Sequence, residues 1–195
     1  MCVITISRQY GSLGSITAQH VADRLNYTIV WRELINQAAM RAGAPDVALA
    51  EIDELNLLGV APTVESLQAY IQAIHVVVME LAKKGNVVIV GRGSQVILRE
   101  FHDVVRVLMI APLALRAERI ATRLSISLRA ARAQVEASDR HRQHFLRRFY
   151  GVQWDDPALY DLVINTQHLT ADDAVDLICR AAQQPVVPTP TGQPV

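Results

Sequence analysis

Two periodicities of apolar residues divide the chain into strands and helices. Apolar, often β-branched runs, typical of strands covered on both faces, lie at 2–7, 27–31, 87–90, 104–112 and 159–166. Apolar residues recur at helical spacing in most of the segments between them: 16–25, 33–42, 64–84, 95–101, 113–124, 127–150 and 170–182. Strands that alternate with helices predict an α/β protein with a parallel sheet wrapped by helices. Residues 46–62 fit neither period.

The formal net charge of the chain is zero, so its total charge indicates no particular partner. The distribution of the charged residues is more informative. Nine arginines but only three acids lie between residues 116 and 148. Such a segment either attracts phosphates or another anion, or is a solvated helix surface. Within it, Arg116, Arg119 and Arg123 recur at helical spacing and are interpreted as a solvated face.

Residues 1–182 are expected to form one domain, followed by a disordered proline-rich tail at 183–195. The two cysteines, Cys2 and Cys179, have neither metal-ligand nor redox spacing and are interpreted as core residues. The N-terminus lacks the features of a signal peptide, and no apolar run reaches the length of a membrane span. We therefore expect a cytoplasmic protein that does not enter a membrane.

The first strand leads into a turn that has the layout of a phosphate-binding loop. The stretch ITISRQYGSLGS, Ile4 to Ser15, joins a strand to a helix through two glycines. Aligned with G-x-x-x-x-G-K-[ST], it has Gly14 in place of the lysine and Ser15 in place of the hydroxyl that contacts Mg²⁺. Backbone amides of Gly11, Ser12, Gly14 and Ser15 can still hold phosphate, because amide donors need no particular side chain. The loop alone leaves an ordinary βα turn as an equal alternative.

Two further turns follow predicted strands, and ligands of parallel α/β folds bind beyond these strand ends. The first is Gly91-Arg92-Gly93, where an arginine between two glycines can approach a phosphate closely. The second is Asn165-Thr166. In the first loop, Arg8 lies at the strand end and can supply the positive charge that the absent lysine would provide.

These segments together resemble the cytidylate kinase-like family, relatives of the bacterial cytidylate kinases within the P-loop nucleoside monophosphate kinases. The resemblance extends over roughly residues 1–181 and rests on ITISRQYGSLGS, WRELI (31–35), VVIVGRGS (87–94), SDRHR (138–142) and WDDPALYDLVINT (154–166). It implies a three-layer P-loop kinase-like fold with an arginine-rich helical lid at about 125–152. It also implies ATP with Mg²⁺ as one substrate, and CMP or a similar small nucleotide as the other.

The resemblance also assigns roles to residues. Arg92, with Gly91 and Gly93, would hold the phosphate of the acceptor nucleotide. Two interpretations of Glu33 are equally open: it lines the acceptor pocket, or it is a solvated residue of its helix. Arg140 and Arg142 of the lid would stabilise the transferring phosphoryl group, with Asp139 orienting one of them. Arg8, assigned from its position in the loop and not from the resemblance, would act with these arginines. Asn165 and Thr166 would border the adenine, although a simple turn that leads to the next helix is an at least equal alternative. The loop motif, and not the resemblance, places Ser15 at Mg²⁺.

Three functions remain open at this point. The first is phosphoryl transfer from ATP to a nucleoside monophosphate. The second is nucleotide binding without catalysis, which the missing lysine favours together with Leu13 at a position where the family has glycine. The third, ranked last, is nucleic-acid binding by the arginine-rich helices.

Overall fold

The fold is built on a single parallel sheet. The computed structural model describes residues 2–31 and 63–184. Within them, five strands pair in the order β2-β3-β1-β4-β5, all parallel. They are β1 (Val3–Arg8), β2 (Thr28–Val30), β3 (Val87–Val90), β4 (Val104–Ile110) and β5 (Leu162–Asn165). Because β1 is central, its carboxyl end lies beside those of β3 and β4.

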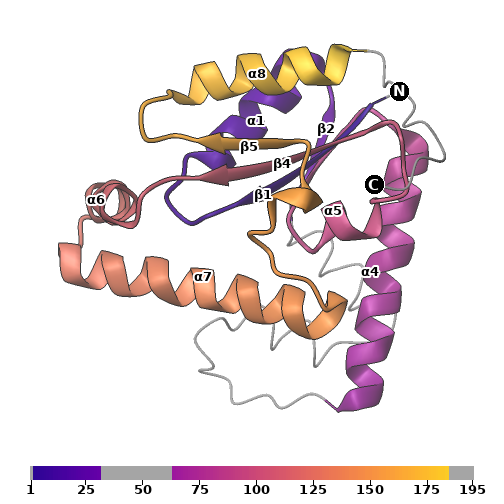
Figure 1. The fold of residues 1–195 in the computed structure, drawn as a ribbon, viewed down its shortest axis with the longest axis horizontal. Coiled ribbons are helices and arrows are strands. Elements are labelled where there is room, and N and C mark those ends of the chain that lie inside the picture. The colour runs from indigo at the N-terminus through magenta and orange to yellow at the C-terminus, as the bar shows by residue number, and fades with distance from the viewer. Residues whose placement is uncertain (1, 32–62, 185–195) are drawn as a thin grey trace, which may run out of the picture.

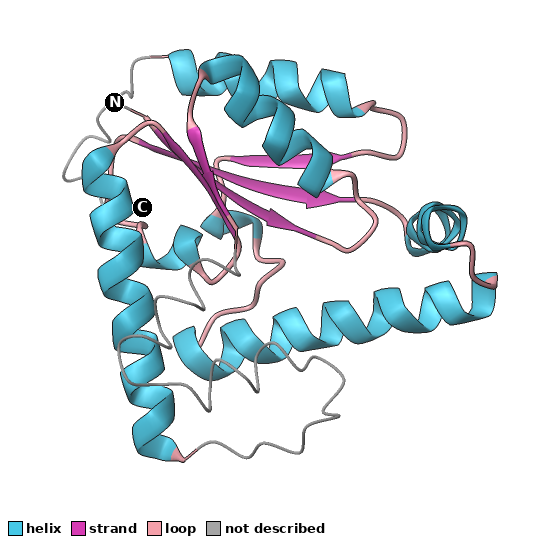
Figure 2. Cartoon of the chain, turned by 180° about the vertical axis from the view of Figure 1, so that it is seen from behind, coloured by secondary structure: helices cyan, strands magenta, loops and turns pink. Residues whose placement is uncertain are grey.

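Helices cover both faces of the sheet and give a three-layer arrangement (Figures 1 and 2). On one face, α1 (Gly14–Leu25) and α8 (Ala171–Gln183) pack against Ile4, Ile6 and their neighbours. On the other lie α4 (Val64–Lys84), the short α5 (Ser94–Ile97) and the C-terminal part of α7 (Leu128–Tyr150). The α/β fold with a parallel sheet wrapped by helices is confirmed.

The strand β1 shows why its sequence is a continuous apolar run. Ile4 and Ile6 are fully buried under α1 and α8, whereas Val3 belongs to the core cluster on the opposite face. A strand covered on both sides must be apolar at successive positions instead of alternating with polar residues. The polar residues Thr5 and Ser7, which are also buried, lie toward the end that carries the site.

Helices α6 (Leu113–Leu124) and α7 frame the carboxyl edge of the sheet. Figure 1 shows α6 end-on beyond the arrowheads of the strands and α7 running below them. The two helices pack on each other through Ile120, Ala131 and Val135, with Tyr10 of the first loop against the same cluster. Segment 127–150, predicted as one or two helices, is one helix, whose first turn is capped by the hydroxyl of Ser127.

Two predicted elements are shorter in the structure. The helix expected at 95–101 extends only from Ser94 to Ile97. The guanidinium of Arg106 donates to the carbonyls that follow it, those of Leu98, Arg99 and Phe101, at 2.7 to 2.9 Å. The last strand begins at Leu162 instead of 159, because a 3-10 turn over Pro157–Leu159 precedes it.

Other expectations have mixed outcomes. Cys179 is buried in the core and Cys2 packs against it, as predicted. In the described part of the chain, none of the helices has the length and apolar character needed to span a membrane. The helix predicted at 33–42, Glu33 and the tail from residue 185 lie outside the described residues.

Candidate active site

The loop after β1 has an unusual backbone. Gly11 and Leu13 both have positive φ, 87° and 64°. Glycine adopts this region freely, but a leucine there is strained, and such strain is concentrated at functional sites. Leu13 immediately precedes α1, whose first amide groups have no partners within the helix and form an anion-binding position.

All four carbonyl groups from Gln9 to Ser12 accept hydrogen bonds within the protein. The donors are Ser12 to Gln9, Arg116 to Tyr10, Arg119 to Gly11 and the hydroxyl of Thr166 to Ser12. These bonds hold the carbonyl side of the loop against α6 and β5. The amide and the hydroxyl of Ser12 both donate to Gln9 O, and this fully buried residue does not line the cleft beside the loop. Gly11, Gly14 and Ser15 do line it, and backbone amides placed in this way can bind a phosphate, as in the loops of P-loop proteins.

Thr166 is a structural anchor of this loop. It is fully buried, its hydroxyl donates to Ser12 O at 3.1 Å, and its carbonyl accepts from Arg119 at 2.8 Å. Burial lowers the pKa of Arg119. Thr166 and the exposed Asn165, whose side chain accepts from the Gln167 amide, do not line the cleft beside the loop. The sequence placed both at the adenine, and that role stays a prediction.

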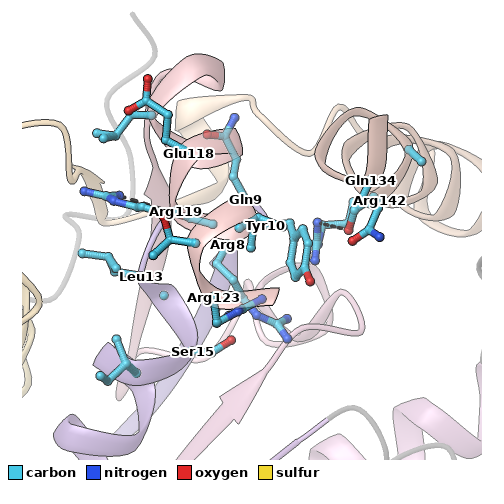
Figure 3. A pocket seen from close by; sticks show the side chains of 18 residues that line it. Arg8, Gln9, Tyr10, Leu13, Ser15, Glu118, Arg119, Arg123, Gln134 and Arg142 are labelled. Carbon is cyan, nitrogen blue, oxygen red and sulfur yellow. Dashed lines mark hydrogen bonds between the residues drawn. The ribbon is translucent and has the colours of Figure 1, made fainter. Parts of the chain in front are cut away.

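A cleft of about 940 Å³ opens beside the loop (Figure 3). It is bounded by residues 8–11 and 13–16 together with side chains of α6 and α7. Its volume suits a drug-sized ligand or a nucleotide. Arg123, interpreted from the sequence as solvated, lines the cleft, and its guanidinium lies 5.2 Å from the ring centroid of Tyr10.

Arg8 and Gly14 are in direct contact in this cleft. A Cβ atom added to Gly14 would lie 2.5 Å from the Cβ of Arg8, closer than two carbon atoms can approach. The other end of Arg8 reaches β3, since its Nη1 lies 3.1 Å from where a Cβ of Gly91 would be. The arginine therefore extends from the loop toward the turn after β3.

That turn forms a second, smaller cavity of about 60 Å³. Gly91, Arg92 and Gly93 all have positive φ, which is again strained for Arg92. The Arg92 side chain is only 7% exposed and lies 5.1 Å from the ring centroid of Phe145, a cation–π contact. The planar guanidinium group is a chemical type that can bind a phosphate in a bidentate manner.

The same turn is held by Tyr150 of α7. Its ring packs so closely on Gly93 that an added Cβ would lie 2.4 Å from it, and its hydroxyl donates to Arg92 O at 3.2 Å. Burial strongly raises the pKa of Tyr150, so the hydroxyl remains a donor at neutral pH. The position therefore requires glycine for two reasons, its positive φ and the contact with the ring.

Arg8 and Arg142 line both cavities. They are contributed by β1 and α7, on opposite sides of the carboxyl edge of the sheet. Two guanidinium groups therefore lie between the loop after β1 and the turn after β3, where their positive charge can stabilise an anion.

The structure separates the two predicted lid arginines. Arg142 accompanies Arg8, whereas Arg140 is exposed and lines neither cavity. Asp139 lies 3.8 Å from Arg142, and its shorter ion pair, 2.8 Å, is with Arg116. Its orienting role stays a prediction. Interpreting Arg116 as solvated was wrong, because the residue is 4% exposed and donates to Tyr10 of the loop.

A magnesium ion would have few protein ligands here. Among the described residues, no cluster of three or more His, Cys, Asp or Glu is placed to hold a metal ion. Ser15 lines the larger cleft and its hydroxyl is exposed, whereas the carboxylate of Glu118, the one acid among the described lining residues, points away from it in Figure 3. This donor set fits Mg²⁺ that arrives on the phosphates of ATP and keeps several waters.

Sequence comparison identifies the protein's family. The model of the cytidylate kinase-like family matches residues 3–168. The chain belongs to this family. A cytidylate kinase of Pyrobaculum aerophilum is 31% identical over 177 residues, which cover 90% of this chain and 89% of the relative. A cytidylate kinase of Halobacterium salinarum is 28% identical, with 96% of this chain and 95% of the relative covered.

Solved structures share the fold of this family member at low identity. An uncharacterised protein from Eubacterium ventriosum superposes with a TM-score of 0.76 at 19% identity and covers 95% of this chain and all of its own. Shikimate kinase from Bacteroides thetaiotaomicron superposes with a TM-score of 0.55 at 10% identity, covering 94% and 99%. The predicted kinase-like fold is thereby confirmed.

Proposed function

We propose that the protein is a phosphotransferase that moves the γ-phosphoryl group of ATP to CMP or a similar nucleoside monophosphate. Family membership supports a kinase of this general kind. The observation that carries the proposal is the pair Arg8 and Arg142, which lines both the cleft beside the first loop and the cavity beside Arg92.

The donor would bind in the larger cleft. The triphosphate of MgATP would lie on the amides of the loop and of the first turn of α1, and Ser15 would contact the magnesium ion. Arg8 would replace the lysine as the positive charge beside these phosphates. Its guanidinium is rigid, always charged and able to bridge two phosphate oxygens.

The acceptor phosphate would bind Arg92 in the smaller cavity. One of its oxygens would attack the γ-phosphorus of ATP, and the bond from that phosphorus to the β–γ bridging oxygen would break, releasing ADP. Negative charge on the transferring group would be stabilised by Arg8 and Arg142, which flank the path between the cavities. No covalent enzyme intermediate is needed, because positioning and charge carry this chemistry.

A non-catalytic nucleotide-binding protein is the second candidate. The observations that favour it are Gly14 in place of the lysine and the strained Leu13, whose side chain lines the cleft where the phosphates would lie. Such a protein would bind ATP through the same loop without consuming it.

Turnover distinguishes these candidates. Purified protein is incubated with MgATP and, in parallel, with CMP, UMP, AMP, GMP or no acceptor, and nucleotides are separated by ion-exchange chromatography. The proposal expects ADP and the matching nucleoside diphosphate in equal amounts with at least one acceptor. Binding of ATP without ADP formation for every acceptor would favour the non-catalytic protein and contradict the proposal.

A further inference from the structure

The phosphate loop and α7 are connected by a largely buried chain of charges, of which the proposed reaction itself uses only Arg142. It consists of Arg116 on α6 with Asp139 and Arg142 on α7. The side chains of Arg116 and Asp139 are only 5% and 18% exposed. Charges at this depth are screened much less by solvent than surface pairs, so a change at one member is felt by the next.

Arg116 binds three different segments with one guanidinium. Its Nε donates to the carbonyl of Ala111 at the end of β4, at 2.8 Å. Its Nη1 donates both to Tyr10 O in the loop, at 3.3 Å, and to Oδ2 of Asp139, at 2.8 Å. The backbone of Arg116 also touches the loop, since a Cβ on Gly11 would lie 2.8 Å from its carbonyl oxygen. A displacement of the loop must therefore move Arg116.

Asp139 lies between Arg116 and Arg142 and is close to both side chains. Its second oxygen, Oδ1, is buried, has no hydrogen-bond partner and lies 3.8 Å from Nη1 of Arg142. The same Nη1 donates to the hydroxyl of Ser138 at 2.8 Å. Oδ1 of Asp139 is about an ångström farther from Nη1 than the hydroxyl of Ser138 is. A small shift of the guanidinium would therefore exchange the hydroxyl for the carboxylate as acceptor while Arg142 still lines both cavities.

We propose that Asp139 is a positioning residue that couples occupancy of the phosphate loop to the placement of Arg142, and thereby to binding in the smaller cavity. This inference rests on the proposed function. A triphosphate on the loop would draw on the loop backbone and on Arg116, and the carboxylate of Asp139 would transmit the change to Arg142. The acceptor would then bind more tightly when ATP is present, and by linkage ATP would bind more tightly when the acceptor is present.

The test measures this coupling directly. The Kd of CMP is determined by titration calorimetry with and without a saturating non-hydrolysable ATP analogue plus Mg²⁺, and the ratio of the two values is the coupling factor. The wild type is expected to show a factor of at least about 5, the lower end of usual allosteric coupling. Asp139→Asn keeps the size and one acceptor oxygen but removes the charge, and should bring the factor below about 2.

Two variants separate positioning from a structural effect. Asp139→Glu restores the carboxylate and is expected to recover part of the coupling. Glu136→Gln removes another carboxylate of α7, one that pairs with Arg132 on the same helix, and should leave the factor unchanged. Thermal unfolding measures whether Asp139→Asn also lowers the stability of the protein. Such a loss would not by itself change the coupling factor, because both Kd values are measured on folded protein.

The possible failures are distinguishable. If the wild type binds neither CMP nor the ATP analogue, the proposed function fails and the inference with it. If both ligands bind but the wild-type factor is 1, or if Asp139→Asn retains the wild-type factor, the inference alone is overturned.

Discussion

A side chain at position 14 and the side chain of Arg8 exclude each other, because the Cβ atoms would lie 2.5 Å apart. A residue with a side chain at position 8 therefore requires glycine at position 14, which excludes the lysine. A lysine at 14 would need the space that the base of Arg8 fills. In this chain the positive charge beside the loop originates from the end of β1 instead of from the start of α1.

Gly14→Lys is therefore expected to destabilise the protein by about 1–3 kcal/mol, the usual cost of overpacking a filled site. Removing the opposing atoms in Arg8→Gly, Gly14→Lys should recover most of this loss, even though Arg8→Gly alone is not stabilising. Urea denaturation of the wild type, both single variants and the double variant gives the coupling energy between the positions. Additive effects of the two substitutions would show that the contact is not a constraint.

Arg92 is expected to determine acceptor binding. Arg92→Lys keeps a positive charge but loses both the bidentate geometry and the stacking on Phe145. Steady-state kinetics should show an acceptor KM raised at least tenfold, with the Kd of ATP changed less than threefold. Arg129→Lys, at an exposed position outside both cavities, is the matched control and should leave both constants unchanged. Loss of ATP affinity in Arg92→Lys would contradict the assignment to the acceptor.

A pH effect on stability is expected from His75 of α4, whose ring stacks on Tyr150 at a centroid distance of 5.9 Å. Partial burial lowers the pKa of His75, so the unfolded chain binds a proton more readily than the folded one. This contribution to stability is complete above the unfolded pKa of about 6.5 and is lost as the pH falls through the folded pKa. Urea midpoints at pH 7.5 and 5.5 should differ more for the wild type than for His75→Gln. Equal pH dependence of the two proteins would argue against this role.

The elements whose bounds depend on the spacing of apolar residues and on local end signals were predictable from the sequence. Helix α4 has the predicted bounds, 64–84, because a long apolar stripe ends at a Gly-Asn pair in which both residues have positive φ. The N-terminus of α8 was also predictable, since Thr170 and Asp173 form a capping box. The end of α5 was not, because it is set by Arg106, a residue of the next strand.

The candidate site shows the same division. Arg8 and Arg92 were identified because each lies where a buried strand ends, which is a property of the local sequence. Arg116 was misplaced because its helical spacing resembles that of a solvated face, and only the packing of α6 on the loop shows otherwise. Arg140 and Arg142 could have been separated, since residues two apart on a helix point in different directions. The i,i+3 spacing of Asp139 and Arg142 was the available signal.

The central claim, that Arg8 supplies the charge of the missing lysine, is tested most directly by the affinity for MgATP. Titration calorimetry would compare the wild type, Arg8→Ala and the exposed control Arg129→Ala, whose residue lines neither cavity. Loss of a charged hydrogen-bonding group predicts a weakening of about 1.5–3 kcal/mol in Arg8→Ala, roughly ten- to one-hundred-and-fifty-fold in Kd, and no change in the control. An unchanged Kd in Arg8→Ala would contradict the claim and show that the backbone amides alone hold the phosphates.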